Sequence, residues 1–564
     1  MDHFVMARPR LRQLIARRIL PGLLATAAML GAGPAQAGTN KGAHQAPPKL
    51  IVAISIDQFS GDVFAEYRSR YRGGLRRLAD AVVFPRGYQG HAMTETCPGH
   101  STILTGAHPS RTGIIGNMWY DSTLQRKDKA VYCVEDPRLP GTDSKNFQVS
   151  AHTLKVPTLG AYMKQASPAT RVVSVAGKDR AAILLGGPRA DHTYWWGARG
   201  FDSYKGVKHV AQVDAVNAEI AKSVKAGAPA QAFPAECGAK GDAGKLLGGI
   251  AGASGFAREP GDYVRFRGSP ALDNVTLQLA RSLVDKMQLG RQNQTDLLAI
   301  GLSATDVIGH RYGPGGVEMC AQQYNLDRAL GAFFEHLDRS GIDYLVVLTA
   351  DHGGHDLAER GAQNAQPLEQ RAAADLMPSE VSKIVGRATG LTGELVWAEL
   401  PGGNVYFSGA LTGEARRVAI ETARKHYASH PQVAAVFTRS ELAGGPPPKG
   451  SVDEWSLLDR ARMSYDPERS GELFVMLKPY VSAVVAPGVT MSTTHGSPWD
   501  MDRRVPILFW RKGLVPFEQS LPVETVDIAP TLAGVLGLSL PAGAMDGRCL
   551  DLIAGEGDSC KPHH

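Results

Sequence analysis

Short apolar runs recur along the chain and predict strands that are buried on both faces of a sheet. Their residues are mostly β-branched or leucine, and they do not alternate regularly with polar residues. Continuous hydrophobicity of this kind is typical of parallel sheets covered by helices on both sides. The runs that we interpret as buried parallel strands are Leu50–Ile56, Arg171–Ala176, Leu297–Leu302, Tyr344–Thr349 and Val505–Phe509.

Two segments between these runs carry apolar residues at helical spacing. They end at Gly290 and Gly341, and glycine is favoured just past the last turn of a helix. A predicted strand follows each helix within a few residues. This alternation predicts an α/β fold, a three-layer sandwich around a mostly parallel central sheet. The apolar positions are Leu272, Val275, Leu279, Leu283 and Met287 in the first helix, and Leu326, Leu330, Phe333, Phe334 and Leu337 in the second.

Two stretches interrupt the alternation of strands and helices. Residues 181–268 are rich in glycine, alanine and lysine, and residues 357–490 mix helical patterns with a hairpin around Val396–Phe407 and the linker Gly444–Pro448. We interpret both stretches as insertions that form a cap over the sheet. The prediction is therefore a single large domain, residues 38–564, with two cap insertions.

The N-terminal residues 1–37 have the pattern of a secretory signal peptide. A basic stretch ending at Arg18 precedes an apolar run, and Ala35-Gln36-Ala37 matches a cleavage site. The apolar run is shorter than the roughly 20 residues needed to span a bilayer, which argues against an uncleaved anchor. We expect a periplasmic or secreted protein that begins near Gly38 and does not contact the membrane after cleavage.

The signal segment also carries most of the positive charge. The whole chain has a formal net charge of +6, and residues 1–37 hold five arginines against one aspartate. The remaining chain is close to neutral, so nucleic acid and anionic membranes are not expected partners. An exported chain can form disulfides, but the six cysteines allow 15 pairings. Only Cys549 and Cys560 are close enough in sequence to suggest a local bridge.

Chemically reactive side chains follow the predicted strands. In open α/β sheets, ligands bind beyond the carboxyl ends of the strands, so these side chains are expected to meet at one edge. Carboxylate, imidazole and cationic groups would all gather there. The side chains are Asp57 after the first strand, Lys178 and Arg180 after the second, Asp306 and His310 after the third, and Asp351 and His352 after the fourth.

The acidic and imidazole groups of this set suit two metal sites. Asp306 and His310 are four residues apart, so on a helical turn they share one face. Asp351 and His352 are adjacent on a turn, and His495 lies in a polar loop before the last strand. Histidine and aspartate together are ligands that zinc accepts, and catalytic zinc sites keep an open position. An isolated Asp-His pair would mean little, but the assembled set predicts a two-metal centre.

The segment Met93–Gly106 predicts a helix that begins at Pro98 and holds the nucleophile at its mouth. Free N–H groups and the helix dipole favour an anion there. Thr96 is a candidate nucleophile, because a hydroxyl bound to zinc loses its proton more readily. On these grounds alone the choice between Thr96 and its neighbours Thr94, Cys97, Ser101 and Thr102 stays open.

Several motifs resemble the alkaline phosphatase superfamily, and most closely its monomeric PafA-type alkaline phosphatases. They occur in the family order and cover most of the chain after residue 49. The matching motifs are Ile-Asp57-Gln, Thr96-Cys-Pro-Gly-His-Ser, Gly-Asn117-Met-Trp-Tyr-Asp, Gly-Lys178-Asp-Arg180, Ser-Ala-Thr-Asp306-Val-Ile-Gly-His310, Ala-Asp351-His352-Gly and Thr-His495-Gly.

The resemblance implies a role for each of these residues. Thr96 would be the nucleophile, and it would be a ligand of the first of two zinc ions. It also implies a phosphothreonine intermediate, a monomer, and small phosphate monoesters as substrates. The implied ligands are Asp57, Asp351 and His352 for the first zinc and Asp306, His310 and His495 for the second, with Asn117, Lys178 and Arg180 on the phosphate oxygens.

The pair Lys178 and Arg180 favours a phosphate monoester over a diester. The oxygens that the metals do not reach remain charged in a monoester, and arginine can grip two of them at once. Related phosphodiesterases generally lack this pair. We keep two alternatives: a nucleotide pyrophosphatase or phosphodiesterase on the same scaffold, and a periplasmic zinc- or phosphate-binding protein without turnover.

Overall fold

The predicted strands form the centre of a mixed ten-stranded sheet in the computed structural model. The strand order is β17-β2-β16-β9-β1-β8-β5-β6-β7, and β18 also pairs with β2. The predicted members are β1 (Leu50–Ile56), β5 (Val172–Ala176), β8 (Asp296–Leu302), β9 (Tyr344–Thr349) and β16 (Arg504–Arg511). The strands that we did not predict are β2 (Val82–Tyr88), β6 (His192–Trp196), β7 (Phe201–Asp202), β17 (Phe517–Glu518) and β18 (Val523–Glu524).

The structure describes residues 46–143, 146–243, 251, 255–363, 369–488 and 490–561. The predicted signal peptide, residues 1–37, lies outside the described residues. In the described part of the chain, no helix is long and apolar enough to cross a membrane.

Four of the central strands are parallel, and their carboxyl ends lie at one edge of the sheet. Strand β1 pairs in parallel with β8 and β9, and β5 pairs in parallel with β8. In this register Ile56 lies opposite Leu302, Ser55 opposite Thr349, and Ala176 opposite Gly301. The residues that follow these strands therefore emerge side by side, as predicted.

The prediction that Val505–Phe509 is a parallel strand is wrong. Strand β16 runs antiparallel to both of its neighbours, β9 and β2. The chain enters β16 from the carboxyl edge of the sheet, through the short helix α17 (Asp500–Arg503). This helix is held beside the end of β9, because the backbone N–H of Gly353 donates a hydrogen bond to Asp502 O at 2.7 Å. A strand that begins at this edge has to run back across the sheet, and its apolar composition does not reveal that direction.

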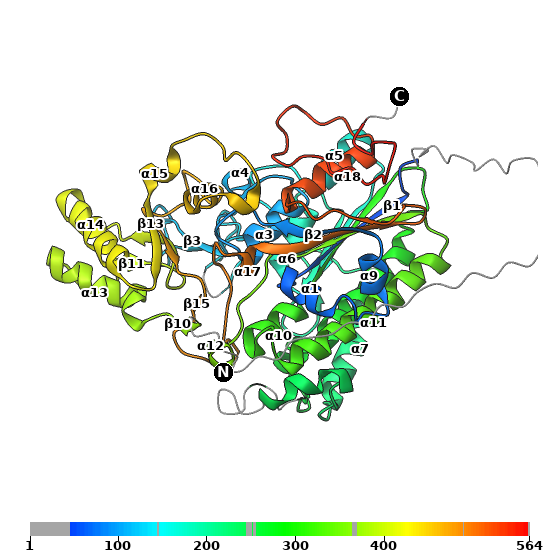
Figure 1. Cartoon of the computed structure of the whole chain (residues 1–564), viewed down its shortest axis with the longest axis horizontal. Helices are drawn as coiled ribbons and strands as arrows, with labels where there is room; N and C mark the ends of the chain where they lie inside the picture. The colour runs from blue at the N-terminus through cyan, green and yellow to red at the C-terminus, as the bar shows by residue number, and fades with distance from the viewer. Residues whose placement is uncertain are drawn as a thin grey trace, which may run out of the picture. The chain divides into compact units, whose positions relative to one another are not determined.

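Helices cover both faces of the sheet, so the predicted three-layer α/β sandwich is confirmed. Alternate residues of β1 point to opposite faces: Leu50, Val52 and Ile54 pack in one hydrophobic cluster, whereas Ile51 and Ala53 pack in another. Figure 1 shows the two helical layers on either side of the strands. The first layer includes α1 (Gly61–Tyr67), α2 (Gly74–Ala79), α7 (Ala211–Ala226), α9 (Ala271–Met287) and α11 (Val317–Arg339), and the second includes α3 (Thr96–Ile103), α5 (Leu159–Ala166) and α18 (Ile528–Val535).

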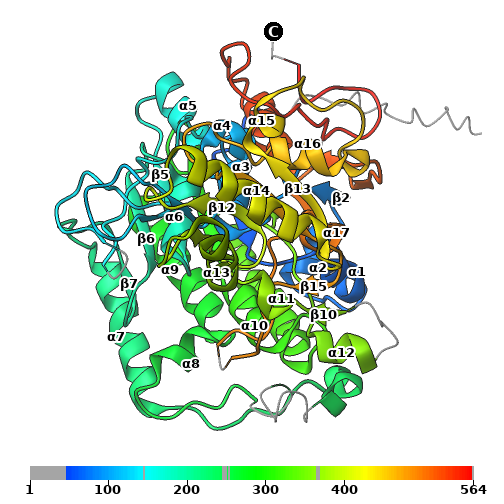
Figure 2. The same cartoon turned by 90° about the vertical axis from the view of Figure 1, so that its left-hand side faces the viewer.

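The two stretches interpreted as insertions differ in what they build. Residues 181–268 contain β6 and β7, which belong to the central sheet. They also contain the helices α7 and α8 (Tyr263–Arg267). Residues 357–490 form a separate four-stranded sheet, and Figure 2 views it with its two long helices in front. The division of the chain at these bounds stays a prediction.

This second sheet confirms the predicted hairpin, because β11 and β12 pair antiparallel. Helices α13 and α14 pack on it through one apolar cluster. Its elements are β11 (Val396–Trp397), β12 (Gly403–Phe407), β13 (Val433–Thr438) and β14 (Leu473–Leu477), with α13 (Pro378–Thr389) and α14 (Gly413–Ser429).

All six cysteines form disulfides, which resolves the pairing that the sequence left open. Cys549 bonds Cys560, as their spacing suggested. The other two bridges join Cys97 to Cys133 and Cys237 to Cys320, which are far apart in sequence. Three disulfides are consistent with an oxidising compartment.

The buried carboxylate of Asp327 on α11 holds the beginning of α2. It accepts hydrogen bonds from the backbone N–H groups of Arg72, Gly73, Leu75 and Arg76 at 2.6 to 3.2 Å. We expect Asp327→Asn to lower the free energy of unfolding by about 3 kcal/mol, because an amide nitrogen would then face N–H donors. Chemical denaturation measures this loss.

The matched control for this stability prediction is Glu335→Gln, on an exposed position of the same helix. This change should alter the free energy of unfolding by less than about 0.5 kcal/mol. Equal unfolding curves for the two variants would contradict the role assigned to Asp327.

Candidate active site

The predicted ligands and cations meet at the carboxyl edge of the sheet. Asp57 directly follows β1, Asp351 and His352 follow β9, and Asp306 lies in α10 (Ala304–Tyr312) after β8. Lys178 follows β5 and is the N-cap of α6 (Asp179–Gly186). All five side chains are buried. Parallel strands in register thus bring together residues that are nearly 300 positions apart, as in the 294 positions between Asp57 and Asp351.

Asp57, Asp351 and His352 form one group that can hold a metal ion. Each offers one ligand atom, and these atoms lie within 4.8 Å of one another. His352 Nε2 is 3.4 Å from Asp57 Oδ1 and 3.2 Å from Asp351 Oδ2. Asp57 Oδ1 is buried and accepts no hydrogen bond in the described part of the chain. A buried carboxylate oxygen without a donor fits a bound cation.

A second group that can hold a metal ion comprises Asp306, His352 and His495, whose ligand atoms also lie within 4.8 Å of one another. His495 Nε2 lies 3.4 Å from Asp306 Oδ1, and His310 Nε2 lies 3.2 Å from the same oxygen. The loop of His495 is held against the end of α10, because His310 O accepts hydrogen bonds from the backbone of Ser492 and Thr493 at 2.7 and 3.1 Å. His310 therefore lies beside this group, and His352 belongs to both groups.

Backbone carbonyls orient the three imidazoles. The Nδ1 atoms of His310, His352 and His495 lie 2.8 to 2.9 Å from carbonyl oxygens of Thr493, Gly353 and Thr94, respectively. A carbonyl can only accept, so each Nδ1 carries the proton and each Nε2 keeps its lone pair toward the carboxylates. Burial lowers the pKa of His352 to about 3, which also favours the neutral ring that binds metals.

The buried charges of the site do not balance without cations. Three carboxylates, Asp57, Asp306 and Asp351, surround one ammonium: Lys178 Nζ is 2.7 Å from Asp57 Oδ2 and 2.5 Å from Asp306 Oδ2. Burial and the neighbouring carboxylates raise the pKa of Asp57 well above its usual range. Burial also acts to raise the pKa of Asp306, but His310 and Lys178 hold it well below its usual range. Divalent cations would offset the excess negative charge.

The hydroxyl of Thr96 points into this charged cluster. Lys178 Nζ donates a hydrogen bond to Thr96 Oγ1 at 3.3 Å, and His352 Nε2 lies 3.5 Å from the same oxygen. The helix was predicted to begin at Pro98, but α3 begins at Thr96. Proline is tolerated at the third position because the first N–H groups of a helix have no intrahelical acceptor. Thr96 thus lies in the first turn rather than before it.

The other candidate nucleophiles are engaged elsewhere. The hydroxyl of Thr94 donates to Ser497 O at 2.7 Å, and that of Ser101 donates to Pro98 O at 2.7 Å. The hydroxyl of Thr102 donates to Gly99 O at 2.8 Å. Cys97 carries no free thiol because it is bonded to Cys133. The geometry therefore favours Thr96 among the alternatives that the sequence left open.

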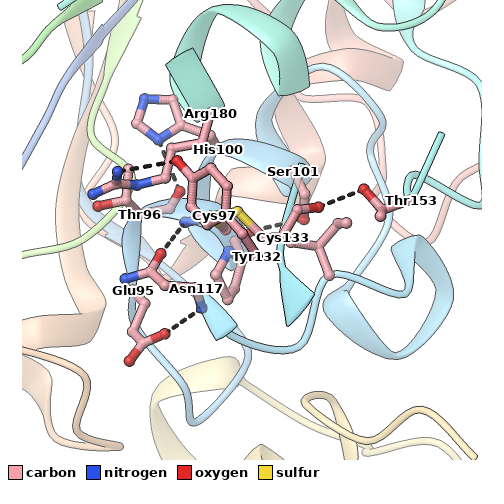
Figure 3. Close-up of a disulfide and its surroundings, with 12 residues drawn as sticks. Glu95, Thr96, Cys97, His100, Ser101, Asn117, Tyr132, Cys133, Thr153 and Arg180 are labelled. Carbon is pink, nitrogen blue, oxygen red and sulfur yellow. Dashed lines mark hydrogen bonds between the residues drawn. A yellow bond between two sulfur atoms is a disulfide. The ribbon is translucent and has the colours of Figure 1, made fainter. Parts of the chain in front are cut away.

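Asn117 and Arg180 lie near Thr96, around the Cys97–Cys133 disulfide (Figure 3). Asn117 Oδ1 accepts a hydrogen bond from the Cys97 N–H at 3.0 Å. Arg180 Nη1 donates to the Tyr132 hydroxyl at 3.3 Å. Burial opposes the charge of Arg180, yet Tyr132, Asp179 and Asp57 raise its pKa, so the guanidinium stays charged.

Comparison with known proteins places this arrangement in a family. The model of the type I phosphodiesterase / nucleotide pyrophosphatase family matches residues 51–498, which include every predicted metal ligand. The chain belongs to this family. The predicted membership of the alkaline phosphatase superfamily is thereby confirmed.

Several relatives of this family member are named alkaline phosphatases. The chain is 53% identical to alkaline phosphatase PhoK of Sphingomonas sp over 91% of this chain and 93% of PhoK. It is 45% identical to alkaline phosphatase PhoD of Zymomonas mobilis over 91% of this chain and 89% of that protein. The crystal structure of alkaline phosphatase PafA superposes with a TM-score of 0.78 at 25% identity, covering 91% of this chain and all of PafA. The predicted PafA-type fold and the prediction of an alkaline phosphatase-type enzyme are confirmed.

Several residues outside the predicted set of site residues of this family member also support the site. Gln58 donates its backbone N–H to Asp351 Oδ1 at 3.1 Å and its side chain to Asp306 Oδ1 at 3.3 Å. His100 Nδ1 lies 3.0 Å from Asp351 Oδ2. Both residues stand inside the quoted motifs, so their position was a signal. Tyr132 stands in no motif, and only the structure brings it to Arg180.

Proposed function

We propose that this protein is a two-zinc alkaline phosphatase that hydrolyses small phosphate monoesters through a phosphothreonine on Thr96. One observation carries the proposal: the Thr96 hydroxyl lies beside His352, the residue that the two candidate ligand groups share. A non-catalytic binding protein would have no use for a hydroxyl at that point. The names of PhoK, PhoD and PafA support a phosphatase rather than a binding protein.

The donor set supports zinc as the metal. Mixed imidazole and carboxylate ligation with buried, oriented Nε2 atoms suits zinc better than all-oxygen metals such as magnesium and calcium. Bound there, two zinc ions would supply Lewis-acid stabilisation of the charge that develops on the attacking and leaving oxygens. The proposed ligands are Asp57, Asp351, His352 and Thr96 for one ion and Asp306, His310 and His495 for the other.

The residues of the chain would carry the reaction as follows. Thr96 Oγ1 attacks phosphorus and forms a new P–O bond, the P–O bond to the leaving group breaks, and the leaving oxygen takes up the proton that Thr96 gives up and departs as the alcohol. The N-terminal turn of α3 stabilises the added negative charge at Thr96 through the helix dipole. Water then cleaves the phosphothreonine, which releases inorganic phosphate and restores the hydroxyl. The site returns to its starting state without any other reactant.

Lys178, Arg180 and Asn117 would bind the phosphate oxygens that remain. Lys178 Nζ already lies 3.3 Å from the nucleophilic oxygen, so its charge is available where phosphate would bind. A monoester dianion keeps a charge on each of the outer oxygens, whereas a diester carries an uncharged substituent on one of them. Two fixed cations therefore stabilise the monoester more than the diester.

The proposed specificity predicts a change of substrate preference in Arg180→Ala. We expect kcat/KM for a phenyl phosphate monoester to fall about 100-fold, and that for the matching diester to fall far less. Initial rates with a monoester and a diester of one chromogenic phenol measure the two effects. Arg189→Ala, on an exposed position just beyond α6, is the matched control and should behave like the wild type.

The alternative is a phosphodiesterase or nucleotide pyrophosphatase, the activities in the name of the matching family. The proposed specificity would be overturned if the wild-type protein preferred the diester and Arg180→Ala left kcat/KM for the monoester unchanged. Absence of phenol release from either substrate by the zinc-loaded protein would leave only the binding-protein alternative.

We also propose that the chain is exported to the periplasm or the medium and acts as a monomer. The three disulfides support an oxidising compartment, since such bonds are rare in the cytosol. N-terminal sequencing of the protein from the periplasmic fraction would test cleavage near Gly38.

A further inference from the structure

We propose that the hairpin of β3 (Met118–Tyr120) and β4 (Ala130–Tyr132), fastened to α3 by the Cys97–Cys133 disulfide, is a clamp that positions both Asn117 and Arg180 for the substrate. We call this hairpin and its disulfide the phosphate clamp. The inference rests on the proposed function, and it adds Tyr132 and the disulfide as positioning groups that act through the two phosphate-binding side chains.

Asn117 is held from both ends of the disulfide. Its side-chain oxygen accepts the Cys97 N–H at 3.0 Å, and its backbone carbonyl accepts the Cys133 N–H at 2.9 Å. Its own N–H donates to Glu95 Oε2 at 2.6 Å. Glu95 and Cys97 flank the nucleophile Thr96, so these three hydrogen bonds fix the position of Asn117 relative to the reacting oxygen. Figure 3 shows Asn117 beside Glu95 and Cys97, to which its hydrogen bonds run.

Arg180 is held by Tyr132, the residue next to Cys133. Within the described part of the chain, the guanidinium of Arg180 makes one hydrogen bond, from Nη1 to the Tyr132 hydroxyl at 3.3 Å, and Arg180 Nε is buried without an acceptor. Tyr132 in turn donates to Asp179 Oδ1 at 2.7 Å and stacks on Phe147 at 4.9 Å between ring centroids. A single phenol oxygen therefore sets where this guanidinium points.

The disulfide links the two halves of this arrangement covalently. Cys97 and Cys133 are both fully buried, in a hydrophobic cluster with Trp119, Val131 and Val134. The hydroxyl of Thr153 also donates to the Cys133 carbonyl. Without the bridge, the hairpin would be joined to α3 only by hydrogen bonds and packing, and it would gain freedom to move away from Thr96. A shift of the hairpin would displace Asn117 and Tyr132 together.

A double-mutant cycle between Tyr132→Phe and Arg180→Ala tests the clamp at Arg180. We expect Tyr132→Phe to raise KM for a phosphate monoester and to lower kcat/KM about tenfold, the size of effect of one hydrogen bond to a charged group. Inhibition by inorganic phosphate should weaken in parallel, while the metal content stays unchanged. In the Arg180→Ala background, Tyr132→Phe should lower kcat/KM by less than about twofold, because the guanidinium that Tyr132 holds is absent.

Tyr406→Phe is the matched control for this cycle. Tyr406 is buried in the same hydrophobic cluster, and its hydroxyl also donates one hydrogen bond, to Arg469 O at 2.8 Å. It should keep kcat/KM within about twofold of the wild type. The clamp is overturned if Tyr132→Phe lowers kcat/KM equally in both backgrounds, or if it does not lower kcat/KM in the wild-type background.

The disulfide is tested by replacing both partners, Cys97→Ala with Cys133→Ala. We expect a larger loss of kcat/KM than from Tyr132→Phe, because Asn117 and Arg180 are affected together. The pair Cys549→Ala with Cys560→Ala removes a disulfide remote in sequence and should lower thermal stability while leaving kcat/KM within about twofold. A folded, zinc-loaded Cys97/Cys133 variant with wild-type KM and kcat would contradict the inference. If that variant does not fold, the Tyr132 cycle decides.

These outcomes separate the clamp from the proposed function. Failure of the wild-type protein to hydrolyse monoesters would remove the function and the clamp with it. Normal turnover that depends on Arg180 but not on Tyr132 or the disulfide would leave the function standing and remove the clamp alone.

Discussion

Thr96→Ala is expected to lower kcat for phosphate monoesters by roughly 10⁴-fold or more while leaving the fold intact. Loss of a covalent nucleophile typically has effects of this size, because the remaining groups can only assist attack by water. The change removes a hydroxyl and a methyl group from the N-terminal turn of α3 and no ion-pair partner. Steady-state turnover, with circular dichroism and metal content as checks, measures the effect.

Two controls separate the Thr96 hydroxyl from its surroundings. Thr96→Ser keeps a hydroxyl and should retain turnover well above that of Thr96→Ala. Ser101→Ala, in the same helix but bonded to Pro98 O, should keep activity near that of the wild type. Incubation with substrate followed by acid quenching should trap phosphate on the peptide that contains Thr96. Unchanged turnover in a folded, metal-loaded Thr96→Ala protein would eliminate Thr96 as nucleophile.

Removal of metal is expected to give the second largest effect, with turnover below about 1% of its initial value. Three buried carboxylates would face a single lysine, so the chelated protein should also unfold at a lower temperature. A ligand present at 100 times its Kd contributes about 2.7 kcal/mol to stability, which sets the scale of that shift. Dialysis against a chelator, elemental analysis and melting curves measure both quantities.

Add-back of single metals tests the identity of the cation. Zinc should restore turnover and the melting temperature together, and calcium or magnesium should not, because the site offers imidazole nitrogens. Elemental analysis should find about two zinc ions per chain, and about one in His495→Ala. Full activity in a chelated protein that contains no metal by elemental analysis would rule out the proposed centre.

Much of the fold and most of the predicted site follow from local sequence patterns. Continuous apolar runs predicted the central strands because strands covered on both faces need no polar residues. The position of Asp57, Asp306 and Asp351 just beyond such runs then predicted their convergence, since parallel strands end at one edge. The same argument placed Lys178 and Arg180 at this edge, and the family motifs added Asn117; the roles of all three stay predictions.

The tertiary structure decided what local patterns do not encode. The direction of β16 depends on where the preceding chain arrives, and its apolar residues are the same in either direction. Disulfide pairing depends on which cysteines the fold brings together, as Cys97 and Cys133 show. The role of Tyr132 depends on a contact with Arg180 across 48 positions of the chain.

The sequence by itself determined which residue types stand at the ends of the buried strands, because side-chain order and hydrophobic pattern are properties of the chain. Only the tertiary structure decided which hydroxyl faces the candidate ligands, why His352 belongs to both groups and which hairpin holds the side chains proposed to bind phosphate. These features depend on contacts between segments that are far apart in the sequence, and such contacts form only when the chain folds into the sheet.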